Sequence, residues 1–152
     1  MNLHIDKLKK SRILTLKLIE GLTIEQLNKI PTGFSNNIIW NIAHLVVTQQ
    51  LLCYKLSGIE CKVSKEMITE FQKGAAPSYN ISEEEIQTIK KHFIELPTIF
   101  EEDLEKGIFT NYHEYKTSVD VTLKNIEDAV IFNLFHEGIH LGIILQLKKL
   151  VS

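Results

Sequence analysis

Arginine is almost absent from this sequence: the chain of 152 residues has 17 basic residues, and Arg12 is the only arginine among them. The guanidinium group is the side chain best suited to reading base edges and phosphates through paired hydrogen bonds. The formal net charge of −2 also leaves no excess of positive charge to attract a polyanion. These two shortages argue against nucleic acid and against an anionic membrane surface as partners.

Cysteine and uninterrupted apolar sequence are scarce as well. Cys53 and Cys61 are the only cysteines, too few for a disulfide framework, so two reduced thiols are favoured over a bridge. The first ten residues, MNLHIDKLKK, are rich in charge, and Lys17 and Glu20 interrupt the apolar stretch that follows. The sequence therefore predicts neither a signal peptide nor a membrane-spanning segment, and we expect a cytoplasmic protein.

Long segments with apolar residues at helical spacing dominate the chain. Leu8, Ile13, Leu16 and Ile19 show this spacing in the first segment, and Ser82 followed by three glutamates is typical of a helix start. No series of strands alternates with these segments. We expect one domain over residues 1–152, with an all-α fold: a four-helix bundle with long crossover connections. The predicted helices cover residues 5–20, 36–57, 83–106 and 126–150, with short helical turns at 23–27 and 66–72 and an extended connection or small hairpin at 108–123.

Three of the six histidines fall at positions that should face the bundle interior. His44 lies in the middle of the apolar stripe of the second helix, and a single histidine there is usually a core residue satisfied by a hydrogen bond. His136 and His140 are four residues apart on the last helix, so both imidazoles can reach one ion. Burying three imidazoles together is costly without a shared partner. The combination therefore favours a metal site, with a hydrogen-bonded core of histidines as the alternative.

The string HEGIH, residues 136–140, matches the H-E-x-x-H pattern of zinc proteases. Such a protease needs a third ligand, normally downstream of the motif. The sequence after His140, LGIILQLKKLVS, contains no His, Asp, Glu or Cys. The obvious third ligand, His44, lies upstream instead. This order disfavours a protease and suits a bundle whose second and fourth long helices are neighbours.

Two motifs and their order identify a resemblance to a known family. WNIAHL on the second helix, within GFSNNIIWNIAHL, and HEGIHLG on the last helix are similar to the DinB-like metal-binding four-helix bundles. That family includes the YfiT-like and bacillithiol transferase-like proteins, and the resemblance covers essentially the whole chain. One departure is that LGIIL follows His140, where family members usually carry Gly-Gln.

The resemblance implies a specific site and several partners. The family's metal ligands match His44, His136 and His140, and its members commonly bind zinc or nickel and form homodimers. Characterised relatives include S-transferases for low-molecular-weight thiols and a thiol-dependent isomerase. We therefore expect a divalent metal ion, a small-molecule substrate that includes a low-molecular-weight thiol, and a homodimer. The sequence does not identify the dimer surface, although exposed apolar positions on the first and last helices could supply it.

Three neutral imidazoles with an open fourth position are typical of catalytic zinc. A metal there could lower the pKa of a bound thiol for attack on a small electrophile, which is the function that we favour. Glu137 is a candidate general base, but it lies about 100° around the helix from His136, which favours a salt bridge or a solvated position. The alternatives are a non-catalytic metal-binding or ligand-binding dimer, and histidines without metal.

Other residues near the predicted site receive weaker hypotheses. Trp40 and Tyr54 could line a pocket, although ordinary core packing accounts for both. Cys53 could act as a nucleophile, but no neighbouring residue in the sequence is expected to lower its pKa.

Overall fold

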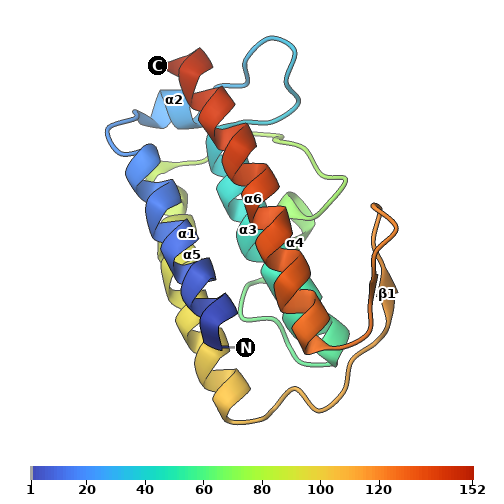
Figure 1. Ribbon diagram of the computed structural model, residues 1–152. Helices are drawn as coiled ribbons and strands as arrows, with labels where there is room; N and C mark the ends of the chain where they lie inside the picture. The colour runs from blue at the N-terminus through green and yellow to red at the C-terminus, as the bar shows by residue number, and fades with distance from the viewer. Residues whose placement is uncertain (1) are drawn as a thin grey trace.

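The computed structural model of the protein describes residues 2–152, with side chains from residue 3 onward. Four long helical stretches form a bundle, confirming the predicted all-α fold (Figure 1). They are α1 (Asn2–Leu18), α3 (Ile38–Gln49) with its continuation, α5 (Glu83–Glu105) and α6 (Ile126–Val151). Two shorter helices, α2 (Ile24–Asn28) and α4 (Lys65–Phe71), lie in the connections.

Side-chain caps fix where most of these helices begin. Ser82 forms a capping box with Glu85, as its position before three glutamates predicted. Thr23 forms a second capping box with Gln26, and the side chain of Asn125 accepts a hydrogen bond at the start of α6. The second long helix was predicted to begin at residue 36, but α3 begins at Ile38. Its N-cap is Asn37, whose side chain accepts a hydrogen bond from the amide of Trp40. The caps therefore set the register in which the histidines of α3 and α6 meet.

The four long helices form a ring in which α1 and α3 each pack against both α5 and α6. In Figure 1, α1 and α6 run upward and α3 and α5 run downward, so α3 and α5 are parallel neighbours. A parallel connection has to return along the length of the bundle. The segment between α3 and α5, which contains α4, makes that crossover. As predicted, α3 and α6 are neighbours.

The second predicted helix is not uniform beyond Gln49. A π-helical turn, η1 (Gln50–Tyr54), and a 3₁₀ turn, η2 (Lys55–Ser57), follow α3 before Gly58 ends the run with φ of 72°. Positive φ favours glycine because it has no Cβ. The π turn changes the helical register, so side chains after Thr48 point in directions that a regular α-helix does not give them. Several of them reach the candidate site.

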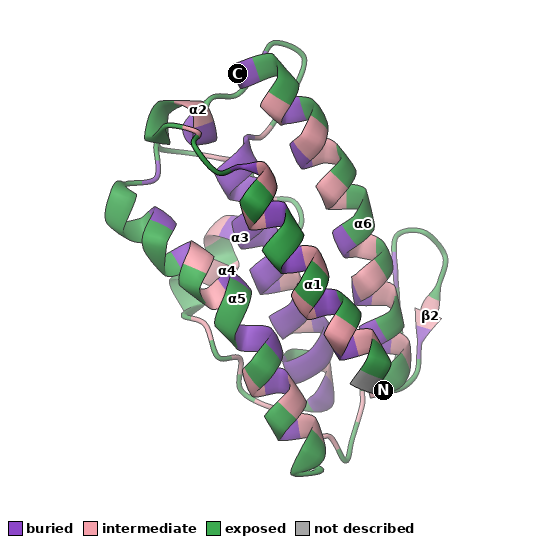
Figure 2. Cartoon of the chain, turned by 60° about the vertical axis from the view of Figure 1, so that its left-hand side comes forward, coloured by how far each residue is buried: buried purple, intermediate pink, exposed green. Residues whose placement is uncertain are grey.

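The core is centred on α3, which is buried on nearly every side between the other helices (Figure 2). By contrast α6 is only partly covered. By length and composition alone it could cross a membrane, although the sequence predicted no membrane-spanning segment. The core helix of a globular protein can have the same length and composition. In this fold α6 packs on α1 and α3 and carries polar side chains in its middle.

A small hairpin joins α5 to α6. Its strands, β1 (Tyr115–Lys116) and β2 (Thr122–Leu123), pair antiparallel with Tyr115 opposite Leu123. This is one of the two predicted forms of residues 108–123. Leu123 is buried against the lower part of the core, which holds the hairpin beside the start of α6.

Candidate metal centre

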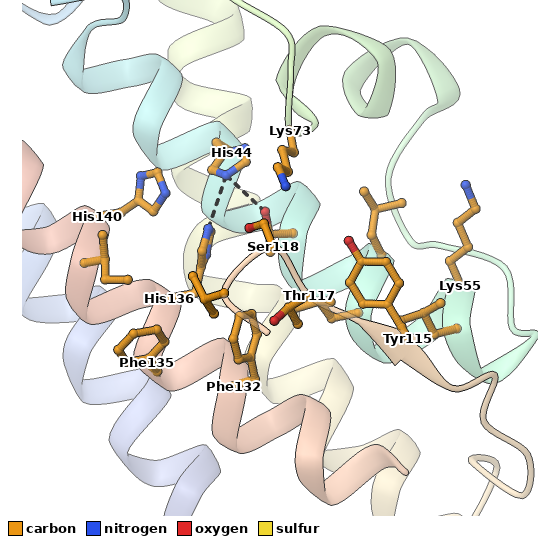
Figure 3. Close-up of a pocket in the computed structure, with 16 residues that line it drawn as sticks. His44, Lys55, Lys73, Tyr115, Thr117, Ser118, Phe132, Phe135, His136 and His140 are labelled. Carbon is orange, nitrogen blue, oxygen red and sulfur yellow. Dashed lines mark hydrogen bonds between the residues drawn. The ribbon is translucent and has the colours of Figure 1, made fainter. Parts of the chain in front are cut away.

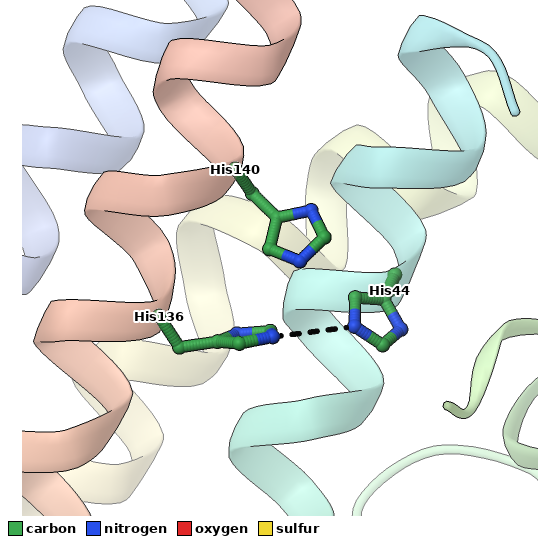
Figure 4. A group of neighbouring side chains, drawn as sticks. All are labelled: His44, His136 and His140. Atoms are coloured by element: carbon green, nitrogen blue, oxygen red, sulfur yellow. Dashed lines mark hydrogen bonds between the residues drawn. The ribbon is translucent and has the colours of Figure 1, made fainter. Parts of the chain in front are cut away.

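His44 from α3 and His136 and His140 from α6 meet at one point, as the sequence predicted (Figure 4). One ring nitrogen from each of them lies within 4.8 Å of the other two. His44 is buried and the other two are half-buried. The i, i+4 spacing puts the two α6 imidazoles one turn apart, with ring centroids 4.4 Å from each other.

The imidazole of His44 is held in one orientation by the crossover segment. Its Nδ1 lies 2.6 Å from the carbonyl oxygen of Phe71, which can only accept, so Nδ1 carries the proton and Nε2 presents a lone pair. The indole of Trp40 stacks on the ring at 4.8 Å, with 10° between the planes, and donates to the carbonyl of Glu70. Both carbonyls belong to the last turn of α4, where they have no intrahelical partner.

The imidazole of His140 is oriented by an amide on α3. Its Nδ1 lies 2.7 Å from Oδ1 of Asn41. The Nδ2 group of the same amide donates to Asn36 and to the carbonyl of Asn37, which fixes the amide with its oxygen toward the histidine. Nδ1 of His140 is therefore the protonated nitrogen, and Nε2 presents a second lone pair.

The third imidazole, His136, completes the convergence. Its Nε2 lies 3.3 Å from Nε2 of His44, while its buried Nδ1 has no hydrogen-bond partner among the described residues. Burial lowers the pKa of His136 to about 3 and that of His140 to about 4, and neighbouring imidazoles add to both shifts. Burial also lowers the pKa of His44. All three rings are thus neutral at neutral pH, the state that binds a metal.

One pair of these nitrogens has the spacing of two ligands on a tetrahedral metal ion. Zinc–imidazole bonds of about 2.0–2.1 Å at tetrahedral angles place two ligand nitrogens about 3.3 Å apart. The Nε2 atoms of His44 and His136 are 3.3 Å apart. The hydrogen bonds to Phe71 and Asn41 are also what metal-ligating histidines usually make through the other ring nitrogen. The three imidazole nitrogens, and the hydrogen bonds that orient two of the rings, therefore fit a divalent ion.

A pocket of about 470 Å³ opens beside the three histidines (Figure 3). Its walls come from the η1 and η2 turns, from α6 and from the hairpin, with two lysines at its edge. The lining residues are His44, Thr48, Leu51, Leu52, Lys55, Leu56, Lys73, Tyr115, Thr117, Ser118, Val119, Phe132, Phe135, His136, Ile139 and His140. Because all three histidines line it, a fourth ligand has a route to the metal position.

Glu137 does not line this pocket. Its carboxylate is buried and accepts two hydrogen bonds from Arg12 of α1, at 2.6 and 3.0 Å. This is the interhelical salt bridge favoured over a general base, although it is buried rather than solvated. Burial raises the pKa of the Glu137 carboxyl, and the guanidinium of Arg12 opposes that shift.

Trp40 and Tyr54 do not line the pocket either. Trp40 stacks on His44, and Tyr54 is in the core, where its hydroxyl donates to Asp103. Cys53 is buried, and burial raises the pKa of its thiol, which disfavours the nucleophilic thiolate. The core-packing interpretation of Tyr54 therefore holds, and Trp40 has a positioning contact as well.

Several contributors to the site were missed at the level of sequence. Asn41 carried a signal, since it is a polar residue three positions before His44 in an apolar helix. The carbonyl of Phe71 had none, because every residue has a carbonyl. Lys73, in the crossover segment, and Ser118, in the hairpin, reach the pocket through tertiary folding that spacing along one helix does not reveal.

Comparison with known proteins agrees with the order of these motifs. No curated protein matches the chain significantly. The sequence profile of the DinB superfamily matches residues 7–144, which include all three histidines, the whole of α3 and α5 and most of α1 and α6. The chain belongs to the DinB superfamily.

Proposed function

We propose that the protein is a metal-dependent transferase that promotes attack of a low-molecular-weight thiol on a small electrophile. The observation that carries the proposal is the convergence of three imidazole nitrogens at the wall of an open pocket. A structural zinc site normally has four protein ligands, whereas three ligands and access for a small molecule are the catalytic arrangement. Zinc or nickel is the proposed ion, since imidazole suits both.

The proposed reaction is a substitution at carbon. The thiol loses its proton to solvent, its sulfur forms a new bond to carbon, and the leaving group departs with the bonding electron pair. A divalent ion supplies a Lewis acid that favours the deprotonated thiol. The chain's own contribution is orientation: Phe71 and Asn41 hold His44 and His140 with Nε2 exposed, and the apolar wall excludes water around the electrophile.

The first test is metal content of protein purified without chelator and without a histidine tag. About one zinc or nickel per chain is expected, and His44→Ala and His136→Ala should each lose it. The metal-loaded protein should then consume a small thiol in the presence of an alkyl halide, and the decrease in free thiol measures this reaction. His136→Ala should show no such decrease. Native protein without metal, with variants that are merely less stable, would leave a hydrogen-bonded core of histidines instead.

A non-catalytic metal-binding or ligand-binding protein is the second candidate. It is favoured by one observation: no Asp or Glu is among the residues that line the pocket, so the described lining offers no carboxylate as a general base. Metal content of about one per chain without thiol transfer to any electrophile of a broad panel would favour this candidate.

A cytoplasmic homodimer is part of the same proposal. Apolar side chains outside the pocket are exposed on the neighbouring helices α1 and α6, among them Ile13, Leu14 and Ile131. Contiguous exposed apolar surface is typical of a protein interface. Sedimentation of the native protein should give twice the mass of the chain, and Ile131→Lys should shift it toward monomer; a monomeric native protein would contradict the proposed dimer.

A further inference from the structure

The charge distribution of the pocket differs from that of the rest of the chain. The protein has 19 acidic residues and a formal net charge of −2. The residues that line the pocket include Lys55 and Lys73 but no aspartate or glutamate. In Figure 3 the two lysines lie at different ends of the pocket, Lys73 near His44 and Lys55 beyond Tyr115. The concave surface is therefore positive within an acidic protein.

Neither lysine is neutralised by the fold. Other cations of the chain form ion pairs, for example Lys9 with Glu101 and Lys62 with Asp103, but neither Lys55 nor Lys73 forms a salt bridge within residues 2–152. Low-dielectric walls around a cleft concentrate the field of such charges. A divalent ion held by three neutral imidazoles would add to this positive charge without any carboxylate in the lining to offset it.

The rest of the pocket lining is mainly apolar, with Thr48, Tyr115, Thr117 and Ser118 as its polar members. Its apolar lining comes from Phe132, Phe135 and Ile139 of α6 and from leucines of the π and 3₁₀ turns, among them Leu51 and Leu56. A volume of about 470 Å³ is within the range of pockets for small organic molecules. An inorganic anion would leave this apolar surface exposed to water, whereas the apolar part of an organic ligand would cover it.

We propose that the electrophile bound in this pocket is an organic anion with an apolar body, its anionic group held by Lys73 or Lys55 and its body against the leucine and phenylalanine walls. This rests on the proposed function, because it names the class of substrate for that site. It accounts for two features together, the unpaired lysines and the apolar wall, each of which a neutral or purely ionic ligand would leave unmatched.

The test is a pair of probes that share one apolar chain, octanoate and 1-octanol, titrated calorimetrically into metal-loaded protein. Octanoate should bind about tenfold tighter than octanol, the effect of one charge-assisted contact. The Lys55→Met/Lys73→Met variant should lose that preference. Lys149→Met, an exposed lysine on α6 away from the pocket, is the matched control and should retain it. Unchanged melting temperatures of all variants confirm that they fold.

The outcomes separate this inference from the proposed function. Equal binding of the two probes, or a preference that survives in the double variant, would overturn the inference, even where metal content and thiol transfer are intact. Lysine-dependent binding of octanoate by a protein that holds no metal would instead support the anion site and reject the metal-dependent transferase.

Discussion

Two polar clusters lie side by side on α6, one buried in the core and the other at the wall of the pocket. Glu137 and Arg12 form a sealed pair at the centre of the bundle, whereas His136, the preceding residue, faces the pocket with His44 and His140. Adjacent residues on an α-helix point about 100° apart, which separates the two clusters. A single turn of α6 therefore serves both the core and the site.

The sealed cluster ties together all four long helices. Arg12 of α1 donates to the carboxylate of Glu137 on α6, to the carbonyl of Phe93 on α5 and to the carbonyl of Leu45 on α3, and its guanidinium lies over the Phe93 ring. Its polar contacts are satisfied by protein. In the histidine cluster, Nε2 of His44 lies 3.3 Å from Nε2 of His136 and 3.4 Å from the hydroxyl of Thr48, and all three imidazoles line the open pocket. The first cluster therefore holds the fold together, whereas the second presents a group of imidazoles that could hold a metal ion.

Breaking the sealed pair should have the largest effect on stability. Glu137→Leu leaves the Arg12 charge buried and without its carboxylate, which should lower the free energy of unfolding by about 3–5 kcal/mol. Denaturant unfolding measures this change. The double variant Arg12→Met/Glu137→Leu should be more stable than either single variant because no unpaired charge remains. A loss below about 1 kcal/mol would show that the pair does not hold the bundle together.

Metal binding should act on the open cluster alone. Zinc at about 100 times its dissociation constant should raise the free energy of unfolding by about 2.7 kcal/mol. His44→Ala and His140→Ala should abolish this increase. Arg12→Met/Glu137→Leu should keep it, provided that the double variant folds. Stabilisation by zinc that persists in both histidine variants would place the metal elsewhere.

Loosening one ligand should have a smaller effect than removing it. Asn41→Leu removes the acceptor for Nδ1 of His140 and should weaken zinc binding about 10- to 100-fold. Competition with a chelating dye measures the affinity. Asn28→Leu, which removes another buried amide of the bundle away from the histidines, controls for loss of stability. Equal weakening by both variants would argue that Asn41 acts only through the fold.

Acid should destabilise the metal-free protein gradually through the open cluster. His136 and His140 take up protons at a pKa of about 3 and about 4 in the folded protein, but at 6.5 when unfolded. Between these values the unfolded chain binds more protons, so stability is greatest above pH 6.5 and falls as the pH decreases toward 4. Melting temperatures measured across this range test the sign. His136→Gln/His140→Gln should show a shallower decrease.

Periodicity and caps were enough to predict the helices and the inward position of the three histidines, because these depend on local spacing. The contact between α3 and α6 was predicted from the histidines that the two helices carry. The buried face of α1 was not predicted correctly from periodicity. Ile13 belongs to the apolar spacing but is exposed, whereas Arg12 is fully buried. Arg12 finds its carboxylate 125 positions away, on another helix. The π turn after α3 was missed for a similar reason, since no residue type is diagnostic of it.

The hydrogen bond that orients His44 has a consequence for experiments that change one side chain at a time. Its acceptor is the main-chain carbonyl of Phe71, and every amino acid at that position would supply the same oxygen. An alanine scan would therefore not detect this hydrogen bond, and comparison of residue types between relatives would not reveal it. Only a change in the path of the backbone, such as an inserted residue between α4 and α5, would expose it.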